Sequence, residues 1–215
     1  MMRQDDKIIE WMERKLPPSL YLHPDVVLIA RELIGKVLVS NFNNELTAGR
    51  IVETEAYNGV YDKAAHSYNN RRTNRTEVTY ATGGVAYIYF CYGIHHMLNV
   101  VTNAKDIPNV VLIRALEPLA GMDTMLLRSK KTVHGNDLTR GPGNVGKSMG
   151  IHTRQSGISL QSNELFIADD GVVYNDDAII ITPRIGVDYA AEDALLPYRF
   201  LVKGNSYVSG KKRFQ

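Results

Sequence analysis

The sequence predicts an α+β fold, in which helices surround one mixed, largely antiparallel β-sheet. Short β-rich runs separated by tight turns recur through most of the 215 residues, whereas few segments show helical periodicity. No internal repeat or low-complexity linker divides the chain. We therefore expect an N-terminal extension with a short helix over residues 1–20 and a single domain over residues 21–215.

Three helices are predicted from local signals. Residues 5–15 have an amphipathic pattern that a Pro-Pro pair ends. Residues 25–35 begin with Asp25, an early negative charge, and end with Gly35, a typical C-terminal cap. A third helix is expected over about residues 121–131.

The predicted strands are rich in β-branched and aromatic residues. They cover residues 36–42, 47–57, 85–91, 97–102, 110–116, 165–168, 178–181 and 199–202. Residues 43–45 join the first two strands as a hairpin, and residues 92–95 form the turn of a second, protruding hairpin. Glu117-Pro118 is expected to end the fifth strand.

Charge is unevenly distributed along the chain, although 25 basic and 23 acidic residues give a formal net charge of only +2. Residues 128–154 contain six basic residues and one acid, and residues 199–215 contain five basic residues and no acid. Such segregation suits a polyanionic partner if the basic residues share a face. Scattered, solvated charge fits the same pattern.

Cys91 is the only cysteine, which excludes an internal disulfide and favours a reducing compartment. Its aromatic and apolar neighbours predict a buried, unreactive thiol. The chain has no apolar run long enough to span a bilayer, and acidic residues occupy the positions where a secretory signal needs its apolar core. We therefore expect neither a membrane-spanning nor a targeting segment.

The strand predicted over residues 47–57 carries two carboxylates on one face. Because side chains alternate along a strand, Glu53, Glu55 and Tyr57 face one side and small or apolar residues face the other. A carboxylate near the end of this strand could act as a general base on water. An exposed face with two solvated glutamates fits the pattern equally well, and alternation does not choose between Glu55 and Glu53.

Aromatic residues cluster around the second hairpin. Tyr87 and Tyr89 share a strand face, an arrangement that is more often core than binding site. Tyr92 lies near the tip, where a ring has little core to bury into and could wedge into a duplex. His66 follows two alanines; a lone histidine is usually a structural hydrogen-bonding residue, but its ring can also stack on a base.

Residues 141–148 match the nucleotide-binding pattern G-x-x-x-x-G-K-[ST], which would place Lys147 and Ser148 at phosphates and Mg²⁺. Polar and charged residues precede the match where a P-loop needs a buried strand, so we interpret it as coincidental. A Gly-rich basic loop that opens a helix can still hold a DNA phosphate, which makes Arg140 and Lys147 candidate backbone contacts. The sequence has no cluster with metal-ligand spacing, and we expect no metal or other cofactor.

Several motifs together resemble the alkyladenine (3-methyladenine) DNA glycosylase family, in the expected order from about residue 20 to residue 210. They are residues 49–57 (GRIVETEAY), 64–67 (AAHS), 87–93 (YIYFCYG), Asn99, 112–118 (LIRALEP), 139–143 (TRGPG) and 183–187 (PRIGV). The resemblance implies a monofunctional hydrolase of base excision repair. Such an enzyme flips alkylated or deaminated purines out of double-stranded DNA and cleaves the N-glycosidic bond, leaving an abasic site.

The resemblance also implies roles for individual residues around the flipped base. Glu55 matches the catalytic carboxylate that deprotonates a water for attack on the sugar C1′. Tyr57, His66 and Tyr89 match the residues that sandwich the base, and Asn99 matches one that helps to screen the purine 2-position.

Further roles concern the DNA itself. Tyr92 matches the wedge that enters the minor groove with its hairpin, and Arg114 matches a residue near the backbone phosphate of the flipped nucleotide. The resemblance implies duplex DNA with damaged purines as partner and a monomeric protein. It also implies a DNA-associated protein of the bacterial cytoplasm, or of the nucleus in a eukaryote.

The loop over residues 69–82 departs from the family pattern. It carries Arg71, Arg72 and Arg75 and flanks the base pocket, so it leaves the range of excised lesions open. Two alternative functions also remain: a P-loop nucleotide-binding protein that uses Gly141–Ser148, and a non-catalytic DNA-binding module.

Overall fold

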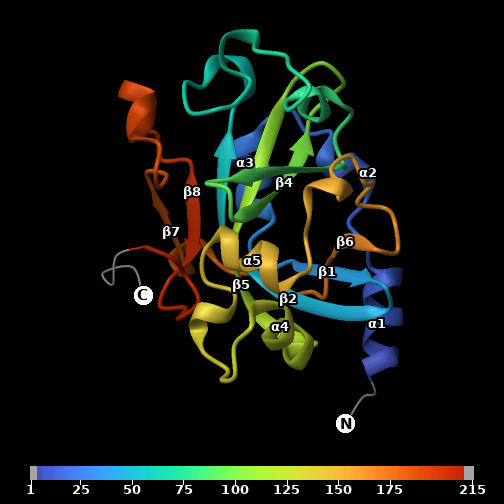
Figure 1. The fold of residues 1–215 in the computed structure, drawn as a ribbon. Helices are drawn as coiled ribbons and strands as arrows, with labels where there is room; N and C mark the ends of the chain where they lie inside the picture. Colours follow the sequence, from blue (N-terminus) through green and yellow to red (C-terminus); the bar gives the residue numbers. More distant parts are fainter. Residues whose placement is uncertain (1–3, 211–215) are drawn as a thin grey trace.

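A sheet of eight strands is central to the computed structural model, which describes residues 4–210 (Figure 1). Its strands are β1 (Val37–Phe42), β2 (Glu45–Tyr57), β3 (Ala86–Cys91), β4 (His95–Thr102), β5 (Asn109–Ala120), β6 (Leu165–Ala168), β7 (Ile179–Thr182) and β8 (Arg199–Val202). The strands pair antiparallel in the order β3-β4-β5-β2-β1-β6, and β8 pairs with both β2 and β7. With the flanking helices, this confirms the predicted α+β fold.

Short helices flank the sheet. They are α1 (Gln4–Glu13), α2 (Pro18–Tyr21), α3 (Val26–Glu32), α4 (Met122–Ser129) and α5 (Pro142–Ser148). The side chain of Asp25 caps α3 by accepting hydrogen bonds from the N–H groups of Val27 and Leu28. The three predicted helices are thus present, each slightly shorter than expected. The structure adds α2 and α5, which both begin with proline, a residue pre-organised for a first helical turn.

β2 is paired along both edges. One edge pairs with β5, whereas the other pairs first with β1, up to Arg50, and then with β8 from Glu53 to Glu55. The register with β5 shifts on either side of Glu53, which marks a local irregularity of the strand. The end of β2 that carries the carboxylates therefore lies inside the sheet.

β5 continues through Glu117-Pro118 to Ala120, so the prediction that these residues end the strand was wrong. Pro118 lies opposite Gly49, next to a register shift between Ala48 and Gly49. Proline has no N–H to donate to a ladder, and an irregular position in the pairing tolerates that loss.

Apolar side chains pack on both faces of the sheet. The main core includes Ile29 of α3, Val52 of β2 and Val145 of α5. A smaller cluster buries Trp11 of α1 against Val37 and other side chains of the sheet. Part of the expected N-terminal extension is thus packed on the domain, and the boundary at residue 20 stays a prediction. Within residues 4–210, the structure contains no helix long and apolar enough to cross a membrane.

Candidate active site

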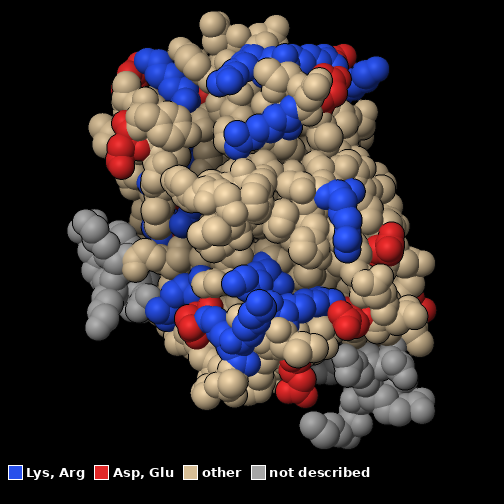
Figure 2. All heavy atoms as spheres, viewed as in Figure 1, with Lys and Arg blue, Asp and Glu red and all other residues tan. Residues whose placement is uncertain are grey.

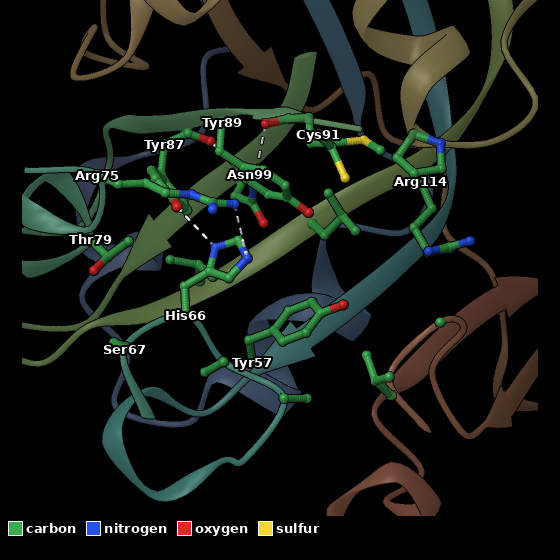
Figure 3. A pocket seen from close by; sticks show the side chains of 18 of the residues that line it. Tyr57, His66, Ser67, Arg75, Thr79, Tyr87, Tyr89, Cys91, Asn99 and Arg114 are labelled. Carbon is green, nitrogen blue, oxygen red and sulfur yellow. Dashed lines mark hydrogen bonds between the residues drawn. The ribbon is translucent and has the colours of Figure 1, made fainter. Parts of the chain in front are cut away.

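A pocket of about 470 Å³ opens at the end of β2, beside the hairpin formed by β3 and β4 (Figure 3). This size suits one small molecule or an extruded base. The structure brings five of the predicted site residues and the hairpin-tip tyrosine to its lining: Tyr57, His66, Tyr89, Asn99, Arg114 and Tyr92.

Aromatic rings form the inner wall of this pocket. The His66 ring meets Tyr89 edge to face, with the ring centroids 4.6 Å apart, and its Nδ1 lies 2.9 Å from the Tyr87 hydroxyl. In Figure 3, Tyr57 lies on one side of His66, and Tyr87 and Tyr89 lie on the other. Tyr87 is buried, as the core interpretation of this strand face predicted, but it also lines the pocket.

His66 is held as a neutral imidazole. Burial, with the nearby charges of Arg75 and Arg71, lowers the pKa of His66 to about 4. An Arg75 guanidinium nitrogen lies 3.3 Å from Nε2, and because a guanidinium can only donate, Nε2 is the acceptor. The Nδ1 proton is therefore available to the Tyr87 oxygen, which fixes the orientation of the ring.

Glu55 is fully buried beneath the pocket. Its Oε2 accepts hydrogen bonds from the Tyr57 hydroxyl at 2.9 Å and from Arg114 Nη1 at 3.1 Å, and its Oε1 accepts one from the Ile185 N–H at 2.8 Å. Burial and the adjacent Glu55 raise the pKa of Tyr57 well above its usual range, so the hydroxyl remains a donor. The alternative of an exposed, solvated carboxylate face is therefore wrong.

Glu53 lies two residues earlier on β2 and is also fully buried. Its Oε1 accepts from Arg114 Nε at 2.8 Å, Arg199 Nε at 2.7 Å and the Ser209 hydroxyl at 2.9 Å, and its Oε2 accepts from the Ser209 N–H at 2.7 Å. The two carboxylates that alternation could not distinguish thus differ in position. Glu55 contacts two pocket-lining side chains, whereas the contacts of Glu53 include Arg199 and Ser209, which are not in the lining.

Arg114 bridges the two carboxylates. Its Nε donates to Glu53, its Nη1 donates to Glu55, and its Nη2 donates to the Ser209 hydroxyl at 3.1 Å. Burial alone would lower the pKa of Arg114, but Glu55 and Glu53 outweigh it and raise that pKa. The guanidinium is thus committed to holding Glu55 in place, and its expected role beside a DNA phosphate stays a prediction.

Asn99 lies on β4, opposite Tyr87 in the pairing with β3. Its side chain is buried, and its Nδ2 donates weakly to the carbonyls of Tyr87 at 3.3 Å and Met97 at 3.4 Å. The amide therefore has a fixed place in the pocket lining, where it could contact one edge of a bound ring.

The β3–β4 hairpin presents apolar side chains to solvent at its tip. Tyr92 is 87% exposed, Ile94 67% and Phe90 50%. Tyr92 and Gly93 both have positive φ, 52° and 70°, and the Ile94 N–H donates to the Cys91 carbonyl at 3.1 Å, as in a type I′ turn. The exposed ring expected at residue 92 is present, and its insertion into DNA stays a prediction.

The segment that matches a P-loop has a different structural role. No strand directly precedes α5 within the described residues, and Ser148 is buried, donating to the Leu138 carbonyl at 2.6 Å. A Cβ at Gly143 would collide with the His95 ring, and one at Gly146 would collide with the His96 carbonyl. These glycines allow α5 to pack closely on β4, which supports the interpretation of the match as coincidental.

Basic side chains gather on the face shown in Figure 2. They form two groups, separated by a broad band with few charged side chains. Lys147 is exposed, whereas Arg140 is half-buried and donates to the Ser206 carbonyl. Of the two candidates for backbone contact from the Gly-rich segment, Lys147 is thus the more accessible, and both roles stay predictions.

Cys91 lines the pocket and is half-buried, contrary to the expected buried thiol, because the hairpin carries it toward the rim. In the part of the chain that the structure describes, no group of three or more His, Cys, Asp or Glu side chains is placed to hold a metal ion.

Comparisons with known proteins agree with these motifs. Residues 20–206 match the model of the family described as Methylpurine-DNA glycosylase (MPG). The chain is 42% identical over 199 residues to a protein of Clostridium perfringens (strain 13 / Type A), covering 89% of this chain and 97% of the relative. It is 44% identical over 188 residues to one of Chlamydia abortus, covering 87% and 97%. Both relatives are named "Putative 3-methyladenine DNA glycosylase".

A relative from Bacillus cereus (strain G9842) bears the same name. It is 43% identical over 203 residues, which cover 91% of this chain and 98% of the relative. The match to the family model includes the carboxylate strand, the aromatic pocket and the hairpin. The chain therefore belongs to the methylpurine-DNA glycosylase family.

Proposed function

We propose that this protein is a monofunctional DNA glycosylase of base excision repair. It flips alkylated or deaminated purines out of duplex DNA and hydrolyses the N-glycosidic bond, leaving an abasic site. The proposal rests on the buried carboxylate of Glu55, which lies beneath an aromatic pocket large enough for one base. The enzyme acts as a monomer and without a cofactor.

Recognition begins at the surface. The exposed ring of Tyr92 enters the duplex and fills the space that the extruded base leaves. The two basic groups of Figure 2 flank the DNA path, with Lys147 and Arg140 near the phosphates. Arg114 contributes a positive charge from the pocket wall, near the backbone phosphate of the flipped nucleotide. Extrusion costs least for a damaged base, which adds selectivity.

The extruded purine stacks between Tyr57 on one side and His66 with Tyr89 on the other, and Asn99 screens its 2-position. Glu55 then receives a proton from water as the water attacks C1′. Within the described residues, Oε1 accepts one hydrogen bond, from the Ile185 N–H, so it retains a lone pair for that water. The carboxylate also stabilises the positive charge that develops on the sugar.

A lyase step is not part of the proposed reaction. Such a step needs an amine nucleophile that forms a Schiff base with the sugar. Within the described residues, the pocket lining includes Arg75 and Arg114 but no lysine, and guanidinium groups stay protonated. This composition supports hydrolysis alone.

The experiment is excision from duplex oligonucleotides that carry a single hypoxanthine or 3-methyladenine-type lesion, with hot alkali to reveal abasic sites. Glu55→Gln should slow excision at least about 10³-fold, because it removes the base and the charge that stabilises the transition state. Its affinity for the lesion duplex should stay within a few-fold of wild type. Glu164→Gln, at an exposed glutamate, is the matched control.

Excision retained in Glu55→Gln would reject Glu55 as the base. Duplex binding by the wild type without lesion preference or excision would instead identify a non-catalytic DNA-binding module.

A further inference from the structure

Arg75, an exposed residue, places a positive charge at the rim of the proposed base pocket. Its Cζ lies 5.1 Å from the centroid of the Tyr89 ring, and its Nη2 lies 3.3 Å from His66 Nε2. Figure 3 shows the side chain reaching toward His66 from the pocket wall. The guanidinium thus lies against two of the rings proposed to hold the base.

The loop that carries Arg75 is anchored on both sides. Thr73 and Thr76 bond to each other, with the Thr73 N–H 2.8 Å from the Thr76 hydroxyl. Arg72 pairs with Glu77 and Asp106 at 2.7 and 2.8 Å. These contacts fix the backbone from which Arg75 enters the pocket.

Arg75 differs from the other arginines at the site in that no carboxylate pairs with it among the described residues. Arg114 pairs with Glu53 and Glu55, and Arg184 pairs with Asp62. Within residues 4–210, Arg75 forms no ion pair, and its described contacts are with the His66 and Tyr89 rings and the Tyr87 hydroxyl. The charge of Arg75 is therefore not paired with a carboxylate among the described residues, although solvent screens part of it.

Both aromatic walls already have an arginine beside them. The Cζ of Arg184 lies 4.8 Å from the centroid of Tyr57, and that of Arg75 lies 5.1 Å from the centroid of Tyr89. A cationic base gains most from aromatic faces that are free of other cations. Here each ring already interacts with a guanidinium, so that gain is reduced.

Damaged purines divide into two classes by charge. Alkylation at N3 or N7 makes the base in DNA a cation, whereas deamination of adenine gives hypoxanthine, which is neutral and carries an acceptor oxygen. An arginine charge repels the first class and can donate hydrogen bonds to the second. We propose that Arg75 is a specificity-determining residue that biases the pocket toward uncharged damaged purines and against cationic ones. This inference rests on the proposed function.

The test compares excision of hypoxanthine and of 7-methylguanine, each placed singly in the same duplex, under single-turnover conditions. Arg75→Gln should raise the ratio of 7-methylguanine to hypoxanthine excision about 10-fold, the effect of one nearby charge in a partly solvated site. Arg75→Lys, which keeps the charge, should stay nearer the wild-type ratio. The matched control is Arg71→Gln, a change of equal charge on the same loop at a residue outside the pocket lining. The Arg71 charge also reaches His66, so this variant should move the ratio in the same direction but by no more than about 2-fold.

An unchanged ratio in Arg75→Gln, or an equal shift in Arg71→Gln, would overturn the inference. If Arg75→Gln loses excision of both lesions, binding replaces excision as the measurement. The affinity for the 7-methylguanine duplex relative to the hypoxanthine duplex is then compared between the single variant Glu55→Gln and the double variant that also carries Arg75→Gln. Wild-type protein that excises neither lesion would instead count against the proposed function.

Discussion

The floor of the pocket (Glu53, Glu55 and Arg114) and the tip of the β3–β4 hairpin (Tyr92 and Ile94) are stabilised in different ways. At the floor, Glu53, Glu55 and Arg114 are buried, and each has several hydrogen-bonding partners. At the tip, Tyr92 and Ile94 are apolar or aromatic, exposed and held on a turn with positive φ. The fold alone stabilises the floor, whereas the tip gains stabilisation only when another molecule covers it.

This difference predicts separate consequences for mutation. A change at the floor removes a partner from buried charges, so it should reduce the free energy of unfolding. A change at the tip removes surface that the folded protein does not use, so it should affect binding and leave stability intact.

Glu53→Gln should give the largest loss of stability. It leaves the buried guanidinium groups of Arg114 and Arg199 without one of their carboxylate charges, and breaking such a pair costs about 3–5 kcal/mol. Urea titration of the free energy of unfolding measures the effect against Glu164→Gln. A loss below about 1 kcal/mol would show that the floor does not depend on this charge.

Tyr92→Ala should weaken binding to a duplex that contains an abasic analogue by about 10- to 50-fold, within the range for loss of one stacked ring. The free energy of unfolding should stay within about 0.5 kcal/mol of wild type, because the ring is exposed. Tyr92→Phe keeps the ring and is the control. Unchanged affinity in the alanine variant would reject the wedge role.

A third effect, confined to acidic pH, concerns His66 in the pocket wall. Its pKa is about 4 in the folded protein and 6.5 ordinarily, so between these values the unfolded chain binds a proton that the folded protein excludes. The free energy of unfolding should therefore fall by up to about 2 kcal/mol as pH decreases from 6.5 to 4, after discounting for partial exposure, and stay level above 6.5. His66→Gln should flatten this part of the profile. Equal slopes in both proteins would contradict the assignment.

Local signals predicted much of the fold. The two-residue turn Asn43-Asn44, with positive φ at both positions, and the turn at Tyr92-Gly93 both lie between runs of β-formers. The strand on either side of each turn follows from the same pattern. Pro118 misled the prediction of β5, because only the pairing partner reveals that its missing N–H falls at an irregular position.

The sequence could not separate Glu53 from Glu55, because alternation places both on the same face. Their difference comes mainly from partners far along the chain: Arg199 and Ser209 hold Glu53, whereas Ile185, with the neighbouring Tyr57, holds Glu55. No local pattern predicts contacts between residues 146 or 156 positions apart. The motifs that resemble the glycosylase family supplied the choice that alternation left open.

The bonds of Glu53 also set an order for assembly during protein synthesis. Residues 53, 114, 199 and 209 must all have left the ribosome before this carboxylate has its partners. The β3–β4 hairpin and the loop of Arg75 are complete much earlier in the chain. We therefore expect the hairpin to form before the buried carboxylates have all their partners, so that the pocket floor is completed only as synthesis ends.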